Sequence, residues 1–351
     1  MIRILIDLYE RQTAQTSWLG AKSEKFSCTN GVRQGGILSP LLYSIYNDIL
    51  LEKLKKNGNG CWIGDYFYGA LSYADDLCIM SPTLSGLQSM LNVCEDYGNV
   101  FDVKFNPKKT QCMKFSKCIN YVMNDIDIRL CGQKLSWVNE FKYLGNWITP
   151  DLSEDVEITR KLGVFFGSVN NLCSTFKNVG VKHILNLFSS YCCHFYGSQA
   201  WRLRDKNIGR MCTAWNKAVR YICNLSPRTH TYYLPYIIGQ LHVSENIYLR
   251  TRKMILTMLH SKNLSVKFLA RSSITNYNSL LGENWRFIHK QIRVDDFCEN
   301  PKMILLTRQN EWFTPECGLI LELLDVIDDY AIIENFYKDD IREMLMYMCT
   351  L

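Results

Sequence analysis

The chain has 351 residues, of which 47% are hydrophobic and 21% are charged, so we expect it to fold rather than stay disordered. Its net charge is only +6, and it contains no run of eighteen apolar residues, so no membrane span is expected. The start of the chain lacks the layout of a signal peptide, and none of the 15 cysteines forms a Cys-x-x-Cys pair. These features favour an intracellular protein, in the nucleus or the cytoplasm.

Residues 1–12 place their apolar side chains at helical spacing, which predicts a helix. This helix begins at the first residue with no cap and no preceding turn, as if it were cut from a longer element. Residues 16–30 then predict a β-hairpin that turns at Gly20, with Trp18 and Phe26 packed.

The next stretch, Gly31–Pro40, reads Gly-Val-Arg-Gln-Gly-Gly-Ile-Leu-Ser-Pro and predicts a loop that opens a helix. We expect Ser39 to cap this helix, with Pro40 at its first position and Gly58 at its end. Its predicted apolar face contains Leu41, Ile45 and Ile49. Arg and Gln before two glycines suit a nucleotide, because they offer donors for phosphate and base with no bulk in the way. An ordinary loop is the alternative.

The most informative stretch is Ala70–Met80, in which Asp75 and Asp76 stand at the centre of an apolar run. Such a run predicts a buried strand or a strand-turn-strand. Burying two carboxylates is costly unless their charge is compensated, and no Lys or Arg lies beside them. A divalent cation such as Mg²⁺ would compensate them. The alternative is an exposed Asp-Asp turn between two strands.

After this stretch the pattern predicts a helix over residues 84–97 that ends at Gly98, followed by short strands up to residue 148. Together these elements predict an α+β layer. From Ser153 onward the period becomes helical. The polar faces of these helices carry a group of basic residues that could contact a nucleic-acid backbone or simply face solvent: Arg204, Arg210, Lys217 and Arg220.

The Gly31–Pro40 stretch, followed by Tyr-Ala-Asp-Asp at residues 73–76, closely resembles the palm of reverse transcriptases. The Val-Arg form before the glutamine resembles the non-LTR (LINE-type) retrotransposons. Two further stretches fit this family in order. Phe105–Thr110 looks like the segment after the post-hairpin helix, and Phe141–Gly145 looks like the primer-grip hairpin.

The resemblance implies an α+β fold with a partial palm, an antiparallel sheet with helices, over residues 1–150. Thumb-like helices would follow over residues 151–200, and a helical C-terminal extension over residues 201–351. The implied activity is RNA-directed DNA polymerisation, a Mg²⁺-dependent transfer of nucleotides from dNTPs to a DNA primer on an RNA template. No membrane partner is expected.

The resemblance also implies residue roles. Asp75 and Asp76 would be the metal ligands, and Lys109 would lie near the leaving pyrophosphate. The incoming nucleotide or the template would contact Arg33, Gln34 and Gly35. Tyr73 would lie near the primer end, and the primer grip would consist of Phe141, Tyr143, Leu144 and Gly145. Each of these residues also has a purely structural alternative. Tyr73 could be a cross-strand aromatic, Arg33 a solvated loop charge and Lys109 a surface lysine. The stretch Phe141–Gly145 could be an ordinary hairpin core.

A third carboxylate, on a strand upstream of the first helix, and a fingers region before it are also implied, and the chain contains neither. We therefore expect an N-terminally truncated enzyme, with an incomplete two-metal site and an activity that is absent or very weak in isolation. The alternative is a non-catalytic nucleic-acid-binding remnant of a retroelement. A purely structural protein is a third possibility.

Overall fold

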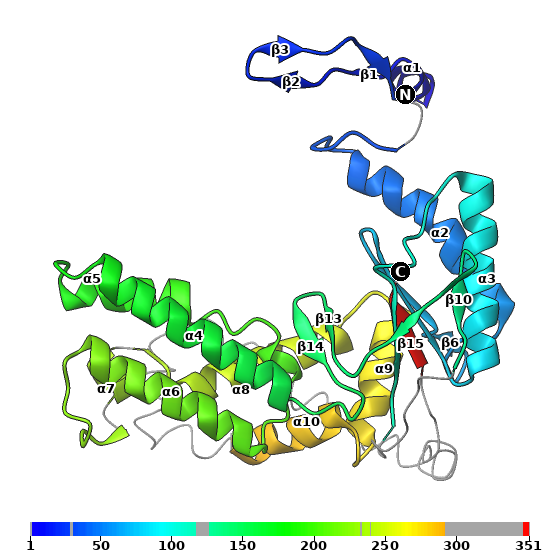
Figure 1. The fold of residues 1–351 in the computed structure, drawn as a ribbon. Helices are drawn as coiled ribbons and strands as arrows, with labels where there is room; N and C mark the ends of the chain where they lie inside the picture. The colour runs from blue at the N-terminus through cyan, green and yellow to red at the C-terminus, as the bar shows by residue number, and fades with distance from the viewer. Residues whose placement is uncertain are drawn as a thin grey trace. The chain divides into compact units, whose positions relative to one another are not determined.

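The computed structural model describes residues 2–28, 31–116, 126–231, 234–238, 240–291 and 347–350. Its contacts divide the chain into two compact units (Figure 1). The first unit contains Met1–Asn139 and Leu345–Leu351, and the second contains Glu140–Met344. Helices and small, mainly antiparallel sheets make up the described residues, which confirms the predicted α+β class. The domain limits at residues 150 and 200 remain predictions.

The N-terminal part of the first unit contains a helix and two strand pairs. Helix α1 spans Ile2–Glu10. Four two-residue strands follow, in which β1 pairs with β4 and β2 pairs with β3: β1 (Thr13–Ala14), β2 (Ser17–Trp18), β3 (Ala21–Lys22) and β4 (Phe26–Ser27). The chain turns at Gly20, as predicted. The predicted packing of Trp18 and Phe26 is wrong, because these side chains are 76% and 52% exposed.

Helix α2 spans Ser39–Asn57 and ends at Gly58, whose φ of +80° gives the left-handed cap that the sequence predicts. Ser39 is not the cap, since its hydroxyl donates a hydrogen bond of 2.6 Å to the carbonyl of Arg33. The predicted apolar face is also wrong. Leu41, Ile45 and Ile49 are exposed, whereas the buried side of the helix carries Leu50 and Leu54.

Helix α3 spans Leu84–Phe101 and packs beside α2 (Figure 1). The side chain of Thr83 caps it by accepting a hydrogen bond of 3.0 Å from the N–H of Gly86. The helix continues past Gly98, the predicted stop. A Cβ atom at Gly98 would lie 2.6 Å from the carbonyl oxygen of Val103, so this glycine allows a close approach of the backbone instead of ending the helix.

The central sheet of the first unit has five strands in the order β12-β9-β15-β8-β7. Their bounds are β7 (Ala70–Tyr73), β8 (Asp76–Ser81), β9 (Gln111–Lys114), β12 (Ser136–Trp137) and β15 (Tyr347–Thr350). Strand β15 pairs antiparallel with both β8 and β9. Two further hairpins are β5 (Trp62–Ile63) with β6 (Tyr66–Phe67) and β10 (Arg129–Leu130) with β11 (Gln133–Lys134).

The core of the first unit joins buried side chains of α2, α3, β8 and β9, among them Leu54, Leu77, Met90 and Cys112. Strand β15 departs from the expectation of a helical extension over residues 201–351, of which residues 292–346 lie outside the described part of the chain. Its place between two strands is set by backbone pairing with segments that lie far away in the sequence, which local periodicity does not report.

The second unit begins with the hairpin β13 (Phe141–Tyr143) and β14 (Asn146–Ile148) and continues with helices. These are α4 (Asp155–Thr175), α5 (Val181–Leu187), the π-helical turn η1 (Phe188–Cys192), the 3₁₀ turn η2 (Ser198–Ala200), α6 (Lys206–Ile222), α7 (Leu234–Ile238), α8 (Val243–Leu259), α9 (Leu264–Thr275) and α10 (Leu280–Gln291). Its core contains Phe165, Phe188 and Trp215. Among the described helices, none is long and apolar enough to cross a membrane.

Candidate active site

The predicted strand-turn-strand around Asp75 and Asp76 is present. Strands β7 and β8 pair antiparallel, with Tyr73 opposite Asp76. Ala74 and Asp75 therefore form a two-residue turn, in which Ala74 has a φ of +51°. Asp75 lies in the turn itself and Asp76 is the first residue of β8, so the alternation of side chains along a strand does not separate the two carboxylates.

The tip of this hairpin is open to solvent. Asp75 and Asp76 are exposed, and so is Tyr73, with 65% of its surface accessible. Burial begins only at Leu77. The expectation that the two carboxylates are buried is therefore wrong, because the turn carries them beyond the apolar part of β8. Because the carboxylates are exposed, no cation is needed to offset a cost of burying them. Exposure also leaves both carboxylates accessible to a metal ion and a substrate.

Helix α2 contributes two residues beside the tip that the sequence analysis missed. The side-chain amide of Asn47 donates a hydrogen bond of 2.6 Å to the hydroxyl of Ser72 on β7. Partial burial, and then the charge of Asp75, raises the pKa of Tyr43. Tyr43 and Asn47 are four residues apart, which places them on one face of the helix. That spacing after the Ser-Pro helix start is the signal that could have identified them.

Lys109 lies at the same end of the central sheet as Asp76. Thr350 of β15 pairs with Cys78 of β8 on one side and with Gln111 of β9 on the other. Asp76 lies two residues before Cys78, and Lys109 lies two residues before Gln111. Lys109 is exposed, in a turn where the carbonyl of Asn106 accepts its N–H at 3.1 Å. The pairing thus places Asp76 and the turn that contains Lys109 at the same end of the sheet.

The loop before α2 is a compact turn that presents exposed side chains. The carbonyl of Arg33 accepts hydrogen bonds from the N–H of Gly36, at 3.2 Å, and from the hydroxyl of Ser39. Gly35 has a φ of +76°, which favours glycine. A Cβ atom at Gly36 would lie 2.6 Å from the Ser39 hydroxyl. The space beside this glycine is therefore filled by Ser39 of the same chain. Arg33 and Gln34 are exposed and accessible to a ligand.

The predicted primer-grip hairpin is β13–β14, and it belongs to the second unit. Leu144 and Gly145 form its turn with φ values of +45° and +83°, the two positive angles typical of a tight hairpin. Phe141, Tyr143 and Leu144 are half-buried, and Gly145 is exposed.

The four basic residues predicted to bind nucleic acid differ in their surroundings. Arg210 donates to side-chain oxygens of Asn207 and Thr159, each at 2.9 Å, and Arg220 donates twice to the carbonyl of Thr229. Arg204 lies 5.8 Å from the ring centroid of Phe287. Lys217 is exposed on α6. Their contact with nucleic acid stays a prediction.

The two carboxylates at the tip suit a metal site that a substrate completes better than a site made of protein ligands alone. In the described part of the chain, no group of three or more His, Cys, Asp or Glu residues could hold a metal ion. Mg²⁺, however, is commonly held by one or two carboxylates together with water and substrate phosphates. Asp75 and Asp76 fit that arrangement, in which a nucleotide completes the coordination, and they do not form a cage of protein ligands alone.

A family profile described as reverse transcriptase (RNA-dependent DNA polymerase) matches residues 3–148. This segment is a reverse transcriptase domain of the non-LTR type. Its non-LTR character rests on two relatives. One is the retrovirus-related Pol polyprotein of the type-2 retrotransposable element R2DM from Drosophila melanogaster, 36% identical over 90 residues. The other is the corresponding Pol polyprotein of the type-1 element R2 from Nasonia vitripennis, 35% identical over 88 residues.

The two alignments cover 26% and 25% of this chain and 8% of each relative, so the chain matches only a small part of their length. The reverse transcriptase domain contains Asp75, Asp76 and Lys109, and it extends to the β13–β14 hairpin in the second unit. Enzymes of this family generally use divalent metal ions and bind a nucleic-acid template and primer. The resemblance inferred from the sequence motifs is confirmed.

Proposed function

We propose that the reverse transcriptase domain carries out Mg²⁺-dependent, RNA-directed DNA synthesis on a primer 3′-end. The observation that supports this most strongly is the pair of exposed carboxylates at the β7–β8 tip, within the matched residues 3–148. The substrates would be dNTPs, a DNA primer and an RNA template. Such a function would be exerted inside the cell, in the nucleus or the cytoplasm.

In this proposal Asp75, in the turn, is the main metal ligand and Asp76 is the second. Mg²⁺ bound there would stabilise negative charge on the attacking and leaving oxygens. The primer 3′-oxygen forms a bond to the α-phosphorus of the dNTP, the bond to the β-phosphate oxygen breaks, and the hydroxyl proton passes to water. Lys109, at the same end of the sheet, would offer positive charge to the leaving pyrophosphate.

The remaining residues would orient the substrates. Arg33 and Gln34, with the backbone at Gly35, would contact the incoming nucleotide or the template. Tyr73 would lie against the primer end, and its 65% exposure leaves the ring accessible. The β13–β14 turn would hold the primer through Leu144 and Gly145, supported by Phe141 and Tyr143.

The number of carboxylates favours slow chemistry. The described residues supply two carboxylates at this tip and no larger cluster of metal ligands, whereas two metal ions need more ligands. The same observation favours the alternative function, a nucleic-acid-binding domain without chemistry. The two proposals differ in whether Asp75 is needed for a chemical step.

Primer extension separates them. The chain is incubated with a primed RNA template, dNTPs and Mg²⁺, and the same preparation is tested for binding to the primed template. We expect slow extension that Asp75→Asn abolishes. Asp65→Asn is the matched control, because Asp65 is also an exposed aspartate in a two-residue hairpin turn, between β5 and β6. Binding without any extension would contradict the polymerase proposal and support the alternative.

A further inference from the structure

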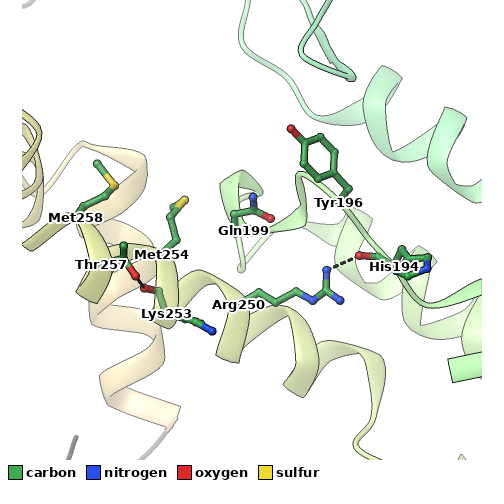
Figure 2. A pocket seen from close by; sticks show the side chains of 8 residues that line it. All are labelled: His194, Tyr196, Gln199, Arg250, Lys253, Met254, Thr257 and Met258. Atoms are coloured by element: carbon green, nitrogen blue, oxygen red, sulfur yellow. Dashed lines mark hydrogen bonds between the residues drawn. The ribbon is translucent and has the colours of Figure 1, made fainter. Parts of the chain in front are cut away.

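The second unit contains a hollow of about 580 Å³ that lies outside the matched reverse transcriptase residues (Figure 2). One wall is a face of helix α8, where Arg250, Met254 and Met258 follow one another at intervals of four residues, with Lys253 beside them. The opposite wall is the stretch that leads into η2 and includes Tyr196. The hollow is therefore built from two elements of one compact unit.

The charge of this hollow favours an anionic ligand. Among the eight described residues that line it, none is acidic, and two carry a permanent positive charge. The guanidinium of Arg250 donates to the backbone carbonyl of His194, as Figure 2 shows, and at 3.5 Å to that of Cys193. An arginine has five N–H donors, more than these two bonds require, so Arg250 is held in place and can still bind a phosphate.

The aromatic ring of Tyr196 offers a second kind of contact. The residue is 55% exposed, and the ring lies near the β13–β14 turn, where a Cβ atom at Gly145 would be 3.3 Å from its Cε1 atom. The ammonium of Lys161 lies 5.5 Å from the ring centroid and 3.4 Å from the carboxylate of Glu157. An exposed ring beside a backbone turn offers a surface on which a nucleobase can stack.

We propose that this hollow binds single-stranded nucleic acid, with phosphates at Arg250 and Lys253 and a base stacked on Tyr196. The polarizable thioethers of Met254 and Met258 give the rest of the surface an apolar character that suits sugars and bases. An inorganic anion alone would leave the exposed ring and the two methionines without a role. This site needs neither dNTP nor Mg²⁺, so the inference goes beyond the polymerase proposal and does not depend on it.

Fluorescence anisotropy of labelled oligonucleotides tests the site in the full chain. The probes are oligouridine RNA and oligothymidine DNA of about eight nucleotides, within the usual site sizes, and a DNA duplex of the same length. Tyr196→Leu removes the ring, whereas Tyr196→Phe keeps it. Lys253→Gln removes a charge at the hollow, and Lys177→Gln removes one from an exposed lysine elsewhere in the same unit. Circular dichroism confirms that each variant is folded.

We expect Tyr196→Leu to weaken single-strand binding roughly tenfold and Tyr196→Phe to bind like the wild type. Lys253→Gln should lower the dependence of log affinity on log salt by about 0.7, with Lys177→Gln unchanged. Single-strand binding is measured without dNTPs or Mg²⁺, so a failure of polymerisation and a failure of this site can be told apart. Comparison of the RNA and DNA probes shows which of the two nucleic acids binds more tightly.

Photo-crosslinking with a 5-iodouridine oligonucleotide gives an independent readout, with the label expected on the peptide that contains Tyr196. Two results would overturn the proposal. One is single-strand affinity within twofold of the wild type for both Tyr196→Leu and Lys253→Gln. The other is duplex binding as tight as single-strand binding, because a stacked base must be unpaired.

Discussion

The buried carboxylate of Glu157 accepts a hydrogen bond of 2.8 Å from the backbone N–H of Trp147. Glu157 lies in the first turn of α4 and Trp147 lies in β14, so this bond ties the predicted primer-grip hairpin to the helix that follows it. The guanidinium of Arg160, one turn further along α4, lies 3.4 Å from the centroid of the Trp147 ring. Helix α4 thus holds the hairpin through both its backbone and its side chains.

Removal of the Glu157 carboxylate should destabilise the second unit. Glu157→Ala leaves the N–H of the partly buried Trp147 without its acceptor, and we expect a loss of about 1–3 kcal/mol in the free energy of unfolding. Glu157→Gln keeps an acceptor and should lose about 1 kcal/mol. Urea denaturation followed by circular dichroism measures both.

The control is Glu140→Gln, which breaks an ion pair of 2.8 Å with Arg160 whose side chains are 47% and 41% exposed. An exposed pair contributes little, so this change should cost less than about 1 kcal/mol. Equal losses of unfolding free energy for Glu157→Ala and Glu140→Gln would contradict a larger stabilising contribution from the Glu157 hydrogen bond.

Two glycines of the second unit should respond to alanine with opposite signs. Gly197 has a φ of +87°, and a Cβ atom there would lie 1.9 Å from the Asn146 side-chain oxygen, so Gly197→Ala should cost about 1–3 kcal/mol. Gly163 lies within α4 with open space around it, so Gly163→Ala should stabilise the protein by about 0.5–1 kcal/mol. Thermal unfolding measures both, and a stabilising Gly197→Ala would contradict the geometry described.

Local features of the fold were predictable because their signals are local. The Tyr-Ala-Asp-Asp stretch predicts a strand-turn-strand around Asp75, and the pattern over residues 84–97 predicts a helix. The structure has both. Gly58 likewise marks the end of α2.

The errors concern choices that tertiary contacts make. The sequence shows that α2 has apolar residues on more than one side, and only packing decides that Leu50 and Leu54 are buried while Ile45 is exposed. Strand β15 is placed by pairing across hundreds of residues. The role of Glu157 was missed because no local pattern connects a helix start to the N–H of Trp147.

Asn47 should position the β7–β8 hairpin, which we propose to be catalytic. Its hydrogen bond to Ser72 links α2 to β7, three residues before Asp75, so Asn47→Ala should slow nucleotide addition by about three- to tenfold, the equivalent of one lost hydrogen bond. Asp48→Ala, at an exposed position of the same helix, should leave the rate unchanged. Single-turnover primer extension provides the rates. Equal rates for the two variants would show that Asn47 does not position the hairpin.

Buried thiols should make the first unit sensitive to alkaline pH. Burial raises the pKa of Cys61 to about 11, and burial together with the nearby Cys61 raises that of Cys78 to about 12. These thiols are protonated in the folded state, whereas in the unfolded chain they ionise from about pH 8.5. Their stabilising contribution is therefore complete below that pH and is lost as the pH rises toward 11–12.

Each buried thiol should lower the free energy of unfolding by about 1.4 kcal/mol per pH unit in this window. Urea titrations between pH 8 and 10.5 under reducing conditions measure the slope. Cys78→Ala removes one titrating group and should reduce it. A free energy of unfolding that stays constant across this range would show that the thiols are not buried as described.

The rate of first-nucleotide addition tests the central claim most directly, namely that the Asp75–Asp76 tip performs Mg²⁺-dependent nucleotidyl transfer. The rate is measured in single turnover on a primed RNA template, across a Mg²⁺ titration, for the wild type, Asp75→Asn and Asp65→Asn. We expect a slow, Mg²⁺-dependent rate that Asp65→Asn preserves and that Asp75→Asn lowers by about 100-fold or more, the scale of lost transition-state charge stabilisation. A rate that Asp75→Asn leaves unchanged, or no addition by a wild-type preparation that binds the primed template, would contradict the account.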